Sequence, residues 1–396
     1  MIQTIRKAWG VPELRKKIVF TLLILLIFRI GNAIPVPYIN TTLLGNYLDS
    51  MSGTVLGLYN VMSGGAFAEA TVFALGVQPY INSSIIIQLL TIAIPALERL
   101  ARDGGEAGKK KIASITRYAT VAIALLQGFG YYMICKNYNI LEQQGIWPAL
   151  VIIVSFVAGS SFVMWLGEQV NEFGVGNGIS IILFAGILSR VPNMVTMGAS
   201  YIRTKGSIGC LWIALLIVGM LAMVVLIVHV NEAERRIPVQ YAKRVVGRRM
   251  MGGQSTYLPI KVNTAGVVPI IFASAVLYLI VYFLMIIGFS YFYATIQFNP
   301  VEISNNLKKN GGFIPGFRPG KPTSDFIAKV LNKVTLFGAI YLGIVAICPL
   351  IAGKLLGNSG LAIGGTSVII VVGVALETVR ALESQMMMRQ YKGFLE

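Results

Sequence analysis

Side chains that commonly carry out chemistry are sparse in this sequence. It contains one histidine, His229, and three cysteines, Cys135, Cys210 and Cys348, which lie far apart. A lone histidine cannot complete a Ser/His/Asp constellation, and isolated cysteines supply neither a disulfide framework nor a metal site. The stretch FGVGNG at 173–178 lacks the spacing of a nucleotide-binding glycine-rich loop. The sequence therefore predicts no enzyme activity, no cofactor and no metal site.

A phrase containing glycine and proline occurs twice, about half a chain length apart. GVQPYI spans 76–81 and GVVPII spans 266–271, and each lies at or near the start of a long apolar run. Proline removes a backbone donor and distorts a helix. In a membrane, the freed polar groups are tolerated where they face protein or a water-filled cavity. The phrases are therefore predicted to interrupt two helices at a functional path, with ordinary packing kinks as the alternative.

The composition is typical of a membrane protein. Hydrophobic residues make up 56% of the chain and charged residues 12%, whereas a soluble domain carries about 25% charged residues. Apolar runs of about 20 residues, enough to cross a bilayer, recur along the whole length. A membrane β-barrel would instead show short alternating strands. The sequence predicts an all-α polytopic membrane protein.

Ten such runs are predicted to span the membrane: 18–36, 71–94, 112–135, 148–167, 177–197, 208–230, 263–280, 281–299, 334–353 and 361–382. Most of the 33 lysines and arginines lie in alternate connecting segments, which places these segments and both termini in the cytoplasm. The largest cytoplasmic loops are 231–262 and 300–333. One predicted cytoplasmic loop, 168–176, breaks the pattern because its charged residues are Glu168 and Glu172.

The two halves of the chain are predicted to be inverted repeats, 1–200 and 201–396. GNGISII at 176–182 resembles GGTSVII at 364–370, and the separation is almost that of the glycine–proline phrases. Five spans lie between equivalent positions, and an odd number reverses orientation in the membrane. Inverted repeats of this kind commonly place the functional path at the interface between the halves.

The predicted path lacks the groups that move ions. No acidic residue lies deep in a span, whereas transporters of charged solutes commonly need ionisable groups there. The deep residues near the repeated phrases are aliphatic, and an aliphatic ring can gate a pore by excluding water. Lipid-facing or core positions are the alternative for each of them. The segment 54–70 is too short to span, and its Ser63-Gly64-Gly65 end suits a movable plug or a short surface helix.

Longer motifs resemble the SecY family, the central subunit of the bacterial protein translocation channel. These motifs are SGGAFAEATVFALGVQPYINSSIIIQLL (63–90), FVMWLGEQVNEFGVGNGISIILFAGI (162–187), RRIPVQYAKRVVGRR (235–249), STYLPIKVNTAGVVPIIFAS (255–274), NLKKNGGFIPGFRPGK (306–321) and GGTSVIIVVGVALE (364–377). The resemblance runs in order along nearly the whole chain.

The resemblance implies two halves of five spans around an hourglass pore, closed by an aliphatic ring and a re-entrant plug at about 54–66. The ring would comprise Val77, Ile81, Ile179, Leu183, Val268, Ile271 and Ile370. The plug would comprise Val55, Leu56, Leu58, Tyr59, Val61, Met62, Ser63, Gly64 and Gly65. A lateral gate between the second and seventh spans would comprise Ile81, Ser84, Ile85, Gln88, Ile271, Ser274 and Leu277.

The resemblance also implies partners and a location. The basic residues that would contact the motor ATPase SecA or the ribosome are Lys243, Arg244, Arg248, Arg249, Lys308, Lys309 and Arg318. Subunits SecE and SecG, a secretory chain with its signal sequence, and anionic lipids are expected as further partners. The implied location is the bacterial plasma membrane.

One segment departs from the family pattern, because 263–298 is short for two spans and the external loop expected between them. We expect either an unusually short hairpin or loop residues absent from this chain. A secondary solute transporter with inverted repeats is the alternative function, and a membrane scaffold or insertase without a pore is a third. The transporter predicts a polar cluster at mid-membrane, which the sequence lacks.

Overall fold

The structure is a computed structural model that describes residues 2–50, 55–102, 104–241, 244–246, 249–251, 255–273, 279–356 and 365–392. Four residues of the predicted sites lie outside these ranges: Lys243, Arg248, Ser274 and Leu277. Contacts divide the chain into two compact units. The first comprises Met1–Leu211, Asn358–Leu361 and Ile370–Glu396, and the second comprises Trp212–Gly357 and Ala362–Ile369. The predicted division into halves of five spans stays a prediction.

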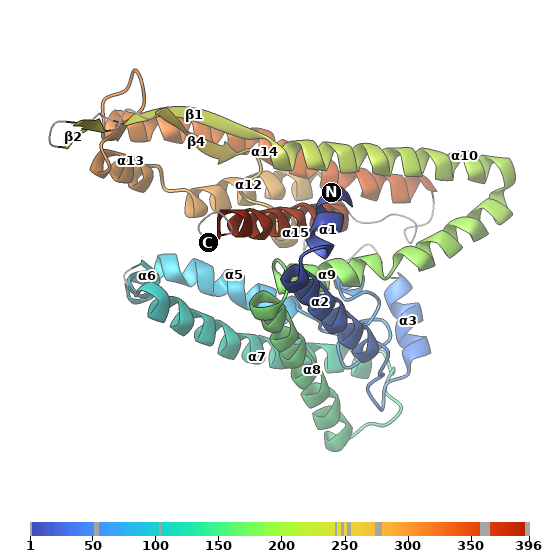
Figure 1. Cartoon of the computed structure of the whole chain (residues 1–396). Coiled ribbons are helices and arrows are strands. Elements are labelled where there is room, and N and C mark those ends of the chain that lie inside the picture. The colour runs from blue at the N-terminus through green and yellow to red at the C-terminus, as the bar shows by residue number, and fades with distance from the viewer. Residues whose placement is uncertain are drawn as a thin grey trace. The chain divides into compact units, whose positions relative to one another are not determined.

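The described residues of the first unit form helices that are joined by irregular segments (Figure 1). Its elements are α1 (Ile2–Trp9), α2 (Pro12–Gly31), α3 (Thr41–Ser50), α4 (Val55–Met62), α5 (Gln78–Ala93), α6 (Pro95–Arg102), α7 (Gly105–Asn137), α8 (Ile146–Phe173), α9 (Gly178–Leu188), the first part of α10 (Val191–Glu232) and most of α15 (Gly365–Lys392). Helix α7 packs along α5 and along α8, while α8 also contacts α2 and α9.

The second unit combines helices with short strands. Its elements are the rest of α10, β1 (Glu234–Tyr241), β2 (Arg244–Val246), β3 (Arg249–Met251), β4 (Ser255–Lys261), α11 (Val268–Ala273), α12 (Leu279–Gln297), α13 (Pro300–Lys309), β5 (Gly312–Phe313), α14 (Lys321–Leu356) and the start of α15. Helix α10 is interrupted at Gly206, whose backbone is not helical.

Several helices can cross a membrane. Within the described residues, five helical stretches have the required length and hydropathy, and the count rises to six if α5 and α6, bent by 106°, form one span. The stretch from Gly178 to Glu232 covers two predicted spans. Helix α14 has 36 residues, roughly 54 Å, well beyond the hydrocarbon thickness of about 30 Å. The count of ten spans remains a prediction.

The predicted span 71–94 is helical only from Gln78, so this prediction was wrong at its beginning. The preceding segment lies buried without a helix and is hydrogen-bonded by its neighbours. The Val72 amide donates to the carbonyl of Ile34 at 2.9 Å, and Ser160 Oγ donates to the carbonyl of Gly76 at 3.2 Å. Gly159 on α8 leaves room for the Val72 carbonyl. Such pairing permits irregular backbone inside a membrane.

The repeated phrases share one local structure, which corrects the prediction that they interrupt two helices and also excludes the alternative of packing kinks within a helix. Gly76 and Gly266 both have positive φ, 52° and 62°. Two residues later a helix begins, and the proline is its second residue, where the missing N–H costs nothing. The amide of Ile81 donates to the carbonyl of Val77, as that of Ile271 does to Val267. Each phrase therefore starts a helix.

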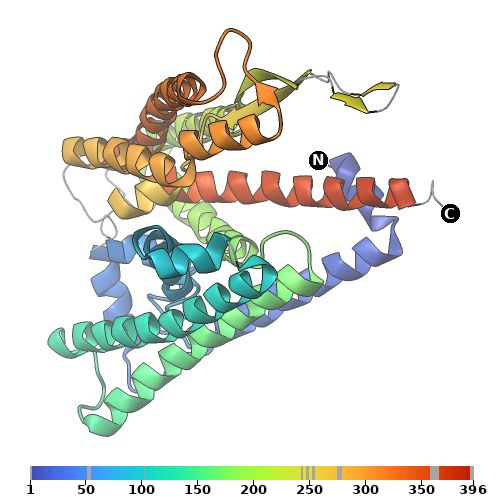
Figure 2. The same ribbon diagram turned by 90° about the vertical axis from the view of Figure 1, so that its left-hand side faces the viewer.

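The loop 231–262 folds into a β-hairpin that the sequence reasoning missed. Strand β1 pairs antiparallel with β4, with Ile237 opposite Leu258, and its end pairs with β5. Figure 2 shows the shorter pair β2–β3 at the far end of this ribbon. The inward side chains share a buried core with α14, comprising Ile237, Val239, Ile260, Ile314, Ile327 and Leu331. Alternation in RRIPVQY is the signal that could have predicted β1.

Candidate plug and pore site

The predicted plug forms helix α4, which has eight residues. At 1.5 Å per residue it is about 12 Å long, so it cannot cross a bilayer. Its last residue, Met62, is buried, as are Ser63 and Phe67 beyond it. The side chains of Val55, Leu58 and Val61 lie outside the described part of the structure. An exposed surface helix, the alternative interpretation, does not fit the burial of this C-terminal end.

Asn60, which the predicted plug residues omitted, organises the turn that follows α4. Its side-chain Oδ1 accepts a hydrogen bond from the amide of Ala68 at 3.1 Å. Its carbonyl accepts from the amide of Gly65 at 2.9 Å and from Ser63 Oγ at 3.2 Å. The signal in the sequence was an asparagine shortly before a glycine pair, because asparagine side chains commonly bond nearby backbone in turns.

Three contacts from distant elements hold this turn. Asn32 at the end of α2 donates its Nδ2 to the carbonyl of Ser63 at 3.3 Å. Gln78, the first residue of α5, donates its Nε2 to Met62 Sδ at 2.7 Å. Just after α9, Ser189 Oγ donates to the Gly186 carbonyl at 2.7 Å and also lies 3.4 Å from the Gly64 carbonyl. The segment is therefore tied to α2, α5 and α9 by individual polar contacts of modest strength.

Two glycines allow the turn to approach α9 closely. A Cβ on Gly64 would lie 2.8 Å from the carbonyl oxygen of Gly186, and one on Gly186 would lie 2.8 Å from that of Met62. Gly64 also has φ of +73°, a conformation costly for other residues. The Ser63-Gly64-Gly65 end, which was predicted to suit a movable plug, is packed at Gly64 against helix backbone.

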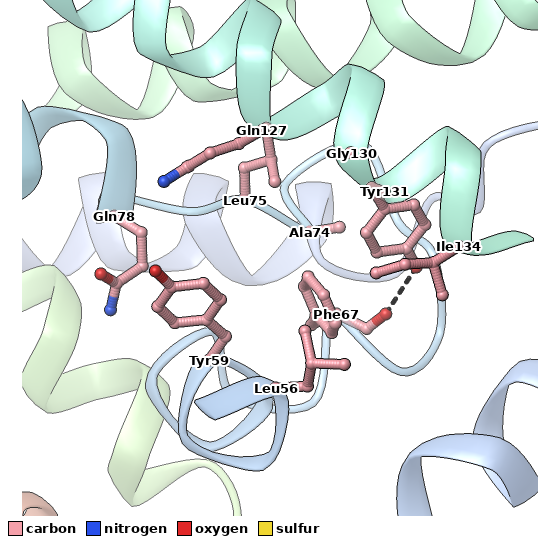
Figure 3. Close-up of a pocket in the computed structure, with 10 residues that line it drawn as sticks. All are labelled: Leu56, Tyr59, Phe67, Ala74, Leu75, Gln78, Gln127, Gly130, Tyr131 and Ile134. Atoms are coloured by element: carbon pink, nitrogen blue, oxygen red, sulfur yellow. Dashed lines mark hydrogen bonds between the residues drawn. The ribbon is translucent and has the colours of Figure 1, made fainter. Parts of the chain in front are cut away.

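An aromatic cluster backs the plug on the opposite side (Figure 3). Phe67 meets Tyr131 of α7 edge to face at 4.8 Å between ring centroids, and the Tyr131 hydroxyl donates to the Phe67 carbonyl at 2.7 Å. Tyr131 in turn contacts Phe156 of α8 at 4.7 Å. Edge-to-face pairs of this kind add specificity to apolar packing.

The predicted ring residues fall in both units. Val77, Ile179, Leu183 and Ile370 are buried in the first unit, where Ile81 is half-buried. On α9, Ile179, Leu183 and Gly186 follow the spacing of one helix face. This face therefore continues from the predicted ring to the plug contact.

Val268 and Ile271, on α11 in the second unit, are half-buried. Ile179 also packs against α8, since a Cβ on Gly167 would clash with its side chain. The seven ring residues are divided between the two units, and their convergence on one ring stays a prediction.

The predicted gate residues on α5 also share a face. They recur at helical spacing at positions 81, 84, 85 and 88. Ile85 is buried, Ile81 and Ser84 are half-buried, and Gln88 is exposed. On the second unit only Ile271 among the predicted gate residues lies in the described structure. The gate itself stays a prediction.

The predicted docking residues that the structure describes lie on the hairpin, on α13 and in the loop between β5 and α14. Arg244 and Arg249 fall on β2 and β3. Lys308, Lys309 and Arg318 have exposed side chains, and the two lysines complement the negative end of the α13 dipole. Their role in docking stays a prediction.

The acidic loop 168–176 has a structural explanation. Glu168 and Glu172 lie within α8, which ends at Phe173, so the connection to α9 is shorter than predicted. Arg117 on α7 forms an ion pair with Glu168, with Nε and Oε1 2.7 Å apart. The acidic side chain is therefore partly neutralised by a basic residue on the adjacent helix.

Solved structures with a similar fold indicate the class of protein to which this chain belongs. The chain aligns with a solved structure described as that of a protein conducting channel, with a TM-score of 0.59 at 17% identity over 94% of this chain and 92% of the other. A structure described as showing that the plug domain of the SecY protein stabilises the closed state aligns with a TM-score of 0.60, at the same identity and coverage. The protein thus has the fold of these helical membrane channels.

Sequence comparison gives the particular family. A family model described as SecY matches residues 71–379. The chain is 43% identical to the protein translocase subunit SecY of Streptomyces scabiei over the full length of both chains. The chain belongs to the SecY family.

Proposed function

We propose that this chain forms a protein-conducting channel that passes unfolded secretory polypeptides across the bacterial plasma membrane, and that it performs no catalytic step. The observation that carries the proposal is helix α4, which is too short to span a membrane yet is tied at its C-terminal end to α2, α5 and α9. Polar contacts of this strength can be broken when a substrate enters. Membership of the SecY family supports the same reading.

The proposed pore is sealed by the aliphatic ring and, when idle, by the plug. Branched aliphatic side chains close around an extended polypeptide without requiring a particular sequence, and they exclude water from a constriction. The continuous face of α9 from Ile179 through Leu183 to Gly186 supports this arrangement, because Gly186 contacts the plug. Moving the plug would then uncover the ring.

Lateral release of apolar segments is proposed between α5 and α11. Both helices begin with the same glycine–proline phrase in the same conformation, which supports equivalent roles in two inverted halves. A segment of about 20 apolar residues would leave through this gate because it partitions favourably into lipid.

Partners are proposed from the charge pattern and from the family resemblance. Both termini and the basic hairpin would face the cytoplasm, where SecA or the ribosome would dock on Arg244, Arg249, Lys308, Lys309 and Arg318. SecE and SecG are the proposed companion subunits, and the same basic surface would attract anionic lipids.

Photocrosslinking tests the pore directly. A photoreactive residue at Ile81 or Ile271 should label a secretory chain stalled during translocation. Matched probes at Leu126 on α7 and Leu221 on α10, whose side chains are largely exposed, should not label it. Labelling at neither Ile81 nor Ile271, combined with solute uptake by the purified protein in vesicles, would instead favour the secondary transporter.

A further inference from the structure

Met62, the last residue of the plug helix α4, carries a sulfur atom whose chemistry the proposed function does not use. The residue is 3% exposed, and its Sδ accepts the hydrogen bond from Gln78 Nε2 at 2.7 Å. Gln78 is buried as well. A thioether is a weak hydrogen-bond acceptor, and it is also the atom of methionine that oxidants attack. The end of the plug therefore holds an oxidisable atom in a closed contact.

The surroundings of Met62 and Gln78 restrict how far the two side chains can move apart. A Cβ on Gly186 would lie 2.8 Å from the carbonyl oxygen of Met62, so the backbone of Met62 rests directly on α9. The amide of Gln78 donates to the carbonyl of Leu75 at 3.2 Å, which fixes the start of α5. A wider gap between Sδ and Nε2 therefore requires movement of a buried side chain or of the plug itself.

Oxidation of Met62 would change both the size and the polarity of this contact. It adds an oxygen atom to Sδ and makes an apolar side chain polar. At 2.7 Å there is no room for that atom between Sδ and Gln78 Nε2. The neighbouring cavity of about 180 Å³ is lined by Gln78, but Met62 is not among the described residues that line it (Figure 3). Extra atoms in a packed interior force neighbours to shift, so the closed plug fits the thioether better than the sulfoxide.

The position of the plug decides whether an oxidant can reach Met62. In the closed state the residue is enclosed, so a peroxide dissolved in water has no access to Sδ. Displacement of the plug would break the contacts that its end makes with Asn32, Gln78 and Ser189. Met62 would then leave its enclosure together with the rest of the turn.

We propose that Met62 is a site of reversible oxidation by peroxides, accessible only when the plug is displaced, and that its sulfoxide keeps the plug from closing again. The proposal rests on the proposed function. A lone pair on Sδ attacks one oxygen of hydrogen peroxide, and the O–O bond breaks as the S–O bond forms. The departing hydroxide takes the proton of the transferred oxygen and becomes water. Sulfur is oxidised and peroxide is reduced, and methionine sulfoxide reductases reverse the change.

Access to Met62 is measured by peroxide treatment of the full chain with its companion subunits in lipid nanodiscs, followed by peptide mass spectrometry. In the idle complex Met62 should stay reduced, as should Met164, which is buried on α8, while Met387, which is 61% exposed, should be oxidised. With a secretory chain stalled in the complex, Met62 should be oxidised and Met164 should not.

A second comparison exposes Met62 without a secretory chain. Asn32→Ala removes the donor to the Ser63 carbonyl, and loss of about one hydrogen bond should raise the rate of Met62 oxidation in the idle complex about fivefold. Oxidation through a transient opening follows the population of the open form. Asn46→Ala, which removes an exposed side chain on α3, should leave the rate unchanged.

The effect of the sulfoxide on closure is measured as ion leak from vesicles. After peroxide treatment of the engaged complex and release of the secretory chain, the leak should stay raised about tenfold, since a polar group would have to return to a site without room for it. Methionine sulfoxide reductases should lower the leak again. Met62→Leu forms no sulfoxide, so peroxide should not change its leak, whereas Met164→Leu should show the wild-type rise.

Equal oxidation of Met62 in idle and engaged complexes would overturn the proposal, as would an oxidised complex whose leak returns to the untreated value. Failure of the channel assignment is separately visible, because crosslinking at Ile81 and Ile271 is measured without peroxide. A complex that crosslinks a secretory chain but keeps Met62 reduced leaves the channel proposal standing and removes this one. Where crosslinking fails, equal Met62 oxidation in the Asn32→Ala and Asn46→Ala complexes removes it.

Discussion

Asn32 Nδ2 donates to the carbonyl of Ser63, and this bond joins the end of α2 to the end of the plug helix. Asn32 is buried, and its Oδ1 has no partner in the structure. The Asn32 side chain therefore contacts the plug through a single donor, beside the contacts that Gln78 and Ser189 make with the same turn. Removing the Asn32–Ser63 bond is therefore expected to change the stability of the closed state.

Asn32→Ala is expected to weaken the closed state by about 1 kcal/mol, because a buried carbonyl loses its donor. That corresponds to roughly a fivefold shift toward the open state. The measurement is ion conductance of the purified channel in planar bilayers without substrate, which should rise. Asn46→Ala, which removes an exposed side chain on α3, is the control, and equal conductance in the two variants would show that Asn32 does not contribute to the plug seal.

Gly64→Ala should open the channel more than Gly65→Ala. Both glycines have positive φ, 73° and 96°, so each substitution carries a backbone cost of about 1–2 kcal/mol. Only Gly64 faces a neighbour, since its Cβ would press on Gly186 and Ser189, while a Cβ on Gly65 meets nothing within 4 Å. Ion leak from vesicles in the absence of substrate should therefore be larger for Gly64→Ala than for Gly65→Ala. The reverse ranking would show that α9 does not hold the plug.

The Arg117–Glu168 pair should couple α7 to α8 weakly. Its side chains are 52% and 25% exposed, and exposed pairs contribute about 0.2–1 kcal/mol. A double-mutant cycle of Arg117→Ala and Glu168→Ala, followed by thermal unfolding, should give a coupling in this range that shrinks with added salt. Glu172→Ala, an exposed neighbour on α8, should show no coupling to Arg117.

The sequence predicted those helices and interruptions that are determined by residues close together in the chain. Apolar runs gave the helices, and the two glycine–proline phrases predicted a paired interruption that the structure places at the starts of α5 and α11. The physical meaning differed, however. A proline as second residue of a helix tolerates its missing donor, so the chain enters the helix there and does not bend within it.

The contacts that hold the plug could not be predicted because their partners are distant in sequence. Ser189 meets Gly64, and Gly186 meets Met62, only after α9 packs beside α4. Nothing in the local sequence distinguishes these residues from others on an apolar helix. The β-hairpin could have been predicted, since the apolar residues of β1 and β4 alternate as in strands, but its many basic residues fit an exposed loop equally well.

The hairpin core gives the last prediction. Ile260 on β4 is fully buried with Ile327 and Leu331 of α14, so Ile260→Ala should destabilise the hairpin by about 2–5 kcal/mol through lost burial and a residual cavity. Tyr257→Ala on the same strand removes a larger side chain that is 62% exposed, and it should change stability by no more than about 0.5 kcal/mol. Hydrogen exchange of the β1 and β4 amides, followed by mass spectrometry, measures both. Similar exchange in the two variants would show that the hairpin does not depend on α14, and the basic residues of β2 and β3 would then lack a rigid support for docking.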